Sequence, residues 1–164
     1  MPFRFLACAA AAVAVVGAES ACGSLASRLR PPPSPPPGYT AVQYDKAQIF
    51  VPSDWPRNQL RCGTPIQNTV VVDPGPVDAC LLGNPPLVSY VWIGIVNNVE
   101  ADPEASVATQ ALTINGHAAR RGVDRLHDGR TRVVLVVLDR KLVVPAVSMD
   151  PKVARQIIDS VWPS

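Results

Sequence analysis

Apolar segments separated by short turns fill the second half of the chain, and this alternation constrains its fold most. Asn115-Gly116 is the strongest two-residue hairpin signal, and Asp128-Gly129 marks a second turn. The expected strands are residues 111–114, 117–123, 131–138 and 142–148, with Asp139-Arg140-Lys141 as the last turn. Because connections this short join antiparallel neighbours, the second half predicts an antiparallel meander.

The first half contains fewer strands and more proline and glycine. Residues 40–44 and 48–51 predict a hairpin, since apolar and polar side chains alternate there. A β-branched run at 68–73 predicts a further strand that ends at a Pro-Gly-Pro breaker. Residues 87–96 are apolar on both faces, which predicts a strand in the interior of the sheet.

One helix is predicted near the C-terminus. Asp150 is a suitable N-cap, Pro151 suits the first helical position, and residues 152–161 carry an apolar face. Asp102 and Pro103 are suited to begin one other short helix. The sequence therefore predicts an α+β fold: a mainly antiparallel sheet with a C-terminal helix packed on it and at most one other short helix.

Residues 1–21 predict a signal peptide. Arg4 precedes an apolar run at 5–17, which is shorter than the ~20 residues of a membrane span. Small residues at 16–18 suit ordinary cleavage. Alternatively, Cys22 follows Ser-Ala in a pattern like the end of a lipobox and would carry lipid, although Glu19 stands where a lipobox has an aliphatic residue.

Two further regions follow the signal. Residues 22–38 predict a proline-rich tether, because PPPSPPPG at 31–38 favours extended polyproline II structure. Residues 39–164 then predict a single α+β domain, since about 125 residues suffice for one hydrophobic core and not for two.

The cysteines predict one disulfide in the domain. Cys8 lies within the signal and Cys22 at its end, which leaves Cys62 and Cys80. An isolated pair in an oxidising compartment favours a disulfide. A metal site is the alternative, but no CxxC or other ligand spacing supports it, and neither a metal nor a cofactor is predicted.

No catalytic set emerges from the sequence. There is no GxSxG motif, and the acidic residues mostly accompany turns. His117 follows one predicted turn and His127 precedes another, so both are expected to be exposed loop residues. The protein is therefore predicted not to be an enzyme.

A local excess of positive charge stands out on a chain whose formal net charge is +2. The cations are Arg120, Arg121, Arg125, Arg130, Arg132, Arg140 and Lys141. On neighbouring hairpins they could form one anion-binding rim for envelope polymers or lipid headgroups. The favoured alternative is a solvated rim that protects the sheet edge.

Two patterns resemble known groups. VPSDWP at 51–56, followed by Cys62, a valine-rich strand and Cys80, resembles uncharacterised exported proteins of actinobacteria, as do INGHAARR at 114–121 and the C-terminal helix. The second half is also similar to the PsbP-like sandwich of small lipoproteins. Neither resemblance implies an activity, a cofactor or a catalytic residue.

These features together predict a small exported module of the cell envelope. It would be extracellular or associated with the cell surface, and would bind a surface protein or an anionic envelope polymer without catalysis. Nucleic acid is not an expected partner, and the membrane is one only through a lipid on Cys22. The alternatives are a lipid-anchored lipoprotein with an apolar ligand cavity and a secreted, enzyme-associated domain.

Overall fold

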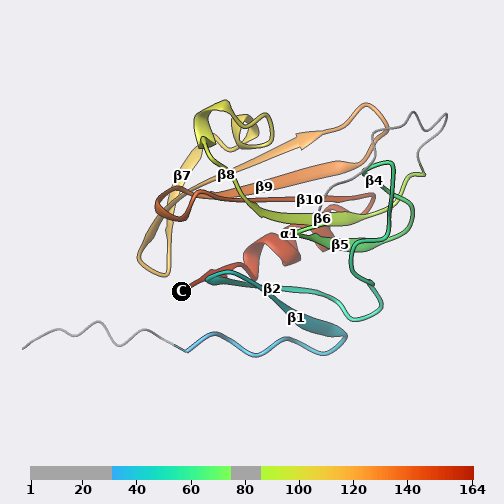
Figure 1. Ribbon diagram of the computed structural model, residues 1–164, viewed down its shortest axis with the longest axis horizontal. Helices are drawn as coiled ribbons and strands as arrows, with labels where there is room; N and C mark the ends of the chain where they lie inside the picture. Colours follow the sequence, from blue (N-terminus) through green and yellow to red (C-terminus); the bar gives the residue numbers. More distant parts are fainter. Residues whose placement is uncertain (1–30, 75–85) are drawn as a thin grey trace, which may run out of the picture.

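The computed structural model describes residues 31–74 and 86–164 (Figure 1). The strands are β1 (Tyr39–Tyr44), β2 (Ala47–Pro52), β3 (Leu60–Arg61), β4 (Thr64–Pro65), β5 (Thr69–Val72), β6 (Tyr90–Ile95), β7 (Gln110–Ile114), β8 (His117–Arg125), β9 (Thr131–Val137), β10 (Leu142–Ser148) and β11 (Trp162–Pro163). The helix α1 spans Pro151–Asp159, and three 3-10 turns are η1 (Val99–Ala101), η2 (Ala105–Val107) and η3 (Leu138–Arg140). The predicted α+β class is confirmed.

The predicted meander forms most of a six-stranded sheet with the order β5-β6-β10-β9-β8-β7. Asn115 and Gly116 both have positive φ, as a tight hairpin turn between β7 and β8 requires. The register pairs Ile114 with His117 across that turn, and Val137 with Leu142 across the turn between β9 and β10. The local turn residues thus fix the antiparallel order of four strands.

One strand pair departs from the hairpin pattern. β5 runs parallel to β6, with Val70 opposite Val91, so the sheet is mixed at this edge. The stretch of sequence between Val72 and Tyr90 is long enough for the crossover connection that a parallel pair requires. β6 lies inside the sheet, as predicted for residues 87–96, but only its odd-numbered residues Val91 and Ile93 are fully buried.

A second, three-stranded sheet has the order β1-β2-β11. The β1–β2 hairpin of this sheet was predicted. The pairing of β11 with β2, which places Trp162 opposite Gln48, was not predicted. Figure 1 shows α1 between this sheet and the larger one. The helix therefore packs on both sheets and joins them into one core.

The C-terminal helix forms for the predicted reasons. Asp150 accepts a hydrogen bond from the backbone N–H of Lys152 at 2.8 Å, and Pro151 occupies the first turn. Ala154, Ile157 and Ile158 are buried against Leu135 and its neighbours in one continuous core. Trp55, which follows the first hairpin, belongs to the same core.

The opposite face of the large sheet is covered by η1 and η2, which are drawn in yellow at the top of Figure 1. Here the predicted short helix is replaced by single 3-10 turns. Asp102, which lies between them, accepts a hydrogen bond from the N–H of Ala105, the first residue of η2, at 2.9 Å. Ala105 and Ala108 pack on Val134 and Val136 of β9. This second, smaller cluster anchors the segment that borders the site described below.

The described end of the proline-rich region touches the domain. Gln48 in β2 donates a side-chain hydrogen bond to the carbonyl oxygen of Pro33 at 3.1 Å. The predicted signal peptide and the start of the tether lie outside the described residues. Within 31–74 and 86–164, no helix has the length and hydropathy needed to cross a membrane.

Candidate functional site

A groove of about 520 Å³ lies over the face of the large sheet that points away from α1. Tyr90 and Trp92 of β6, with Val143 and Pro145 of β10, form its floor. Side chains alternate along a strand, so these residues face the groove while Val91 and Ile93 face the core below. The groove is thus built on the rigid centre of the sheet.

Two irregular segments border the groove. The β3–β4 hairpin contributes Gly63, Thr64 and Pro65, and the turn before η2 contributes Asp102 and Glu104. One border is therefore uncharged and the other carries two carboxylates.

The indole of Trp92 leans along β6 over Gly94. A Cβ atom at Gly94 would lie 3.4 Å from Nε1 of Trp92 and 3.7 Å from its Cδ1. Both are ordinary contact distances, so the ring lies close to the strand without depending on the absence of a side chain at Gly94. Tyr90 stands two residues earlier on the same face, so two flat rings follow one another along the groove.

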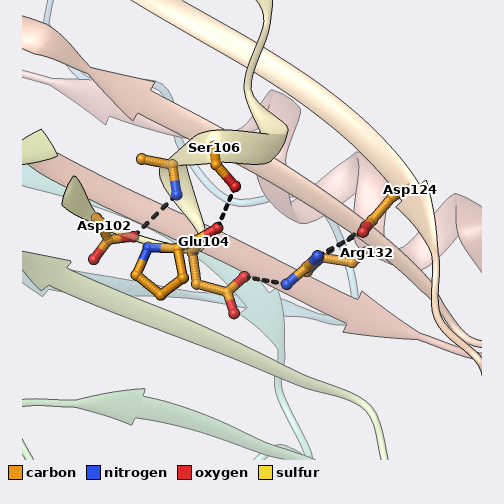
Figure 2. A network of polar contacts seen from close by, with 7 residues as sticks. Asp102, Glu104, Ser106, Asp124 and Arg132 are labelled. Carbon is orange, nitrogen blue, oxygen red and sulfur yellow. Dashed lines mark hydrogen bonds and ion pairs between the residues drawn. The ribbon is translucent and has the colours of Figure 1, made fainter. Parts of the chain in front are cut away.

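Arg132 in β9 fixes the acidic border, as Figure 2 shows. Its Nη1 donates to Oε2 of Glu104 at 2.9 Å, and its Nε donates to Oδ1 of Asp124 at 2.9 Å. The hydrogen bond from Arg132 lowers the pKa of Asp124, and the two carboxylates raise the pKa of Arg132. Asp124 and Arg132 are therefore held in their charged forms at neutral pH.

Tyr90 lies beside a second ion pair. The guanidinium of Arg130 is 5.8 Å from the centre of its ring, and Arg130 also binds Asp128 and the carbonyl oxygen of Val88. Burial raises the pKa of Tyr90, so its hydroxyl stays protonated at neutral pH. It can therefore donate a hydrogen bond as well as accept one.

The structure does not gather the seven predicted rim cations into one surface. Arg120 and Arg121 are neighbours in β8 and point to opposite faces, where Arg120 binds Glu100 and Arg121 binds Asp159 in α1. The other ion pairs are Arg130 with Asp128, Arg132 with Glu104 and Asp124, and Arg140 with Asp139. Among the described residues, no carboxylate forms an ion pair with Arg125 or Lys141. An anion-binding role for these seven residues remains a prediction.

The two histidines differ in their surroundings. His127 is exposed, as expected, but the expectation of an exposed loop for His117 is wrong. His117 is the first residue of β8, its side chain is 14% exposed, and its Nδ1 lies 2.7 Å from Oδ2 of Asp139. This contact lowers the pKa of Asp139. Neither His117 nor Asp139 lines the groove.

Cys62 lies in the turn between β3 and β4, has a positive φ, and is disulfide-bonded. Its predicted partner Cys80 lies outside the described residues, as does Cys22 with its predicted lipid. The pairing of Cys62 with Cys80 therefore remains a prediction. In the part of the chain that the structure describes, no group of three or more His, Cys, Asp or Glu residues could hold a metal ion.

The groove was not recognised in the sequence. Residues 87–96 were read as apolar on both faces, yet Tyr90, Trp92 and Gly94 alternate with the fully buried Val91 and Ile93. This alternation of aromatic and aliphatic positions was the signal that could have separated the two faces. The residues that border the groove come from segments distant in the sequence, so no local pattern indicates that they lie together.

Comparison of the chain with protein-family models, with curated proteins and with solved structures finds no match. The resemblance to exported actinobacterial proteins and to PsbP-like domains remains a prediction. The function must therefore be argued from the groove itself.

Proposed function

We propose that this protein is a small exported module of the cell envelope that binds a surface polymer or protein without catalysis. The groove over β6 and β10 supports this proposal best. Concave sites with aromatic floors and a few polar groups are the usual binding sites of proteins, and this groove combines Tyr90 and Trp92 with Asp102 and Glu104. The disulfide at Cys62 suits an oxidising compartment outside the cytosol.

The groove favours binding over hydrolysis. A glycosidase needs two carboxyl groups that flank the scissile bond. Asp102 and Glu104 instead come from one border, two residues apart, and Glu104 is engaged by Arg132. His117 and Asp139, which form the nearest approach to a catalytic dyad, lie away from the groove.

The alternative function, a lipid-anchored lipoprotein with an apolar ligand cavity, has less support than binding in the groove. In the described residues, the layer between α1 and the two sheets is filled by fully buried side chains such as Ile49, Leu135 and Ile157. The groove lies outside this layer and carries charge on one border. It therefore suits a polar or amphipathic ligand better than an acyl chain.

The experiment is a retention assay on the insoluble envelope fraction of the producing cells. Wild-type protein should be retained, and Trp92→Ala should lower its affinity by about tenfold or more, the loss expected for a central aromatic contact. Trp162→Ala, which truncates a half-buried tryptophan on the other sheet, is the matched control and should bind like wild type. Equal retention of wild type and Trp92→Ala would exclude the groove as the binding site.

A further inference from the structure

The aromatic floor and the acidic border of the groove together indicate which class of ligand it binds. We infer that the groove binds a neutral, hydroxyl-rich polysaccharide, whose sugar rings stack on Tyr90 and Trp92 while their hydroxyl groups donate to Asp102 and Glu104. This inference rests on the proposed binding function. It follows from the shape of the floor, the free acceptors on the border and the sign of the local charge.

The floor is made of flat rings on a sheet face. Two residues along a strand span about 6.8 Å, so Tyr90 and Trp92 offer two adjacent platforms in line with β6. β6 pairs with β5 from Tyr90 to Ile93 and with β10 on both sides of Pro145. Backbone hydrogen bonds run between the strands of a sheet, so a ligand on this face meets mainly side chains. A chain of rings with apolar faces fits such a platform without requiring backbone hydrogen bonds.

The acidic border offers acceptors that the protein does not use up. Asp102 uses Oδ1 for the N–H of Ala105, and Glu104 uses Oε2 for Arg132. In the described residues, the other oxygen of each carboxylate accepts no hydrogen bond. An ionised carboxyl group only accepts, so the matching ligand groups are donors such as sugar hydroxyls.

The local charge argues against a polyanion. Asp102 and Glu104 line this border. Arg132 divides its charge between Glu104 and Asp124, which leaves an excess of negative charge on this side of the groove. An anionic polymer or a phospholipid headgroup would be repelled there. For this groove we therefore infer a neutral polymer, while the anionic polymer expected from the arginine-rich hairpins remains a separate prediction.

A proline-rich peptide is the main competitor, because such peptides also bind grooves lined by aromatic rings. Its backbone carbonyls are acceptors, however, and prolines have no N–H to donate. Such a peptide would therefore place acceptors against the carboxylates of Asp102 and Glu104. Sugar hydroxyl groups can donate hydrogen bonds to these carboxylates, whereas peptide carbonyl groups cannot.

The test uses three preparations of the insoluble envelope fraction from the producing cells: untreated, digested with protease, and oxidised with periodate, which cleaves vicinal diols. Retention should survive protease and be lost after periodate. Asp102→Asn keeps an acceptor for the N–H of Ala105 and should weaken retention about 2- to 10-fold through loss of one charged acceptor. Between about 0.05 and about 0.5 M salt, retention on a neutral glycan should change little.

The outcomes separate this inference from the proposed function. Retention that is lost after protease but kept after periodate would overturn the polysaccharide and leave a protein partner for the groove. Retention that falls steeply with salt would overturn the neutral ligand in favour of a charged one. If wild type binds untreated envelope no better than Trp92→Ala does, both the proposed function and this inference fail. Circular dichroism of each variant verifies that it is folded.

Discussion

A Cβ atom on Gly122 would overlap the carbonyl oxygen of Val107 and lie 2.9 Å from the Cα atom of Ala108. The backbone that follows the acidic border therefore rests directly on β8, with no side chain between them. This close approach fixes the height of η2 above the sheet. The position of Asp102 and Glu104, in the turn before η2, thus depends on Gly122 in β8.

We predict that Gly122→Ala destabilises the protein and disturbs the groove. The added methyl group must displace backbone rather than a flexible side chain, which costs about 1–3 kcal/mol or more. Equilibrium denaturation gives the change in the free energy of unfolding. Gly94→Ala is the matched control, since its Cβ would meet Trp92 at an ordinary distance of 3.4 Å, and it should cost less. A free energy for Gly122→Ala within about 0.5 kcal/mol of wild type would contradict the predicted overlap.

The Asp124–Arg132 ion pair predicts a stability that falls in acid. Arg132 lowers the pKa of Asp124 below its ordinary value of 3.8. Since the folded-state pKa is the lower one, the stabilisation is fully present above about pH 4 and is lost as the pH falls through the lowered pKa. Asp124→Asn should cost about 1 kcal/mol at neutral pH, and this difference should shrink in acid.

Denaturation curves measured from pH 7 down to about pH 2 would check this prediction. Asp54→Asn removes an exposed carboxylate between β2 and β3 and provides the control for net charge. If the difference between wild type and Asp124→Asn stayed constant over the whole range, the ion pair would not stabilise the fold.

Ser160 joins the end of α1 to the smaller sheet. Its hydroxyl oxygen accepts from the N–H of Phe50 in β2 at 2.8 Å, and its O–H donates to the carbonyl oxygen of Ile157 at 2.6 Å. Ser160→Ala should cost about 1–2 kcal/mol, because the part-buried N–H of Phe50 loses its acceptor. Hydrogen exchange at the Phe50 amide should accelerate.

Ser164→Ala is a suitable control for this variant, because it removes an exposed serine hydroxyl that donates to the carbonyl oxygen of Lys46. It should change stability by less than about 0.5 kcal/mol. Unchanged exchange at Phe50 in Ser160→Ala would show that the hydroxyl is dispensable for holding β2 to the helix.

The pairing of Cys62 with Cys80 is open to direct measurement. Peptide mapping of the protein without reductant should recover one peptide pair that joins these two cysteines. Reduction should lower stability by about 3 kcal/mol, the value expected for a loop of this length in the chain-entropy model. Cys22→Ser is the control and should leave the pair intact. A peptide that joins Cys62 to Cys22 would refute the predicted connectivity.

Features that depend on neighbouring residues were predicted correctly, and features that depend on contacts between distant segments were not. The cap at Asp150 and the turn at Asn115-Gly116 were predicted correctly, because each depends on residues within a few positions. His117 was misplaced because β8 begins directly after the turn, and Asp139 of η3, between β9 and β10, lies against it. The acidic partners of the arginines could not be predicted, since residues such as Glu100 and Asp159 lie in other elements.

The sequence by itself determined the strands, the tight turns and the capped helix, because alternation, positive-φ residues and capping side chains act locally. Only the tertiary structure decided the parallel pairing of β5 with β6, the second sheet on the far side of α1, and the groove over Trp92. Each of these brings together segments far apart in the chain. Their geometry follows from packing and register across the whole core, which no local pattern encodes.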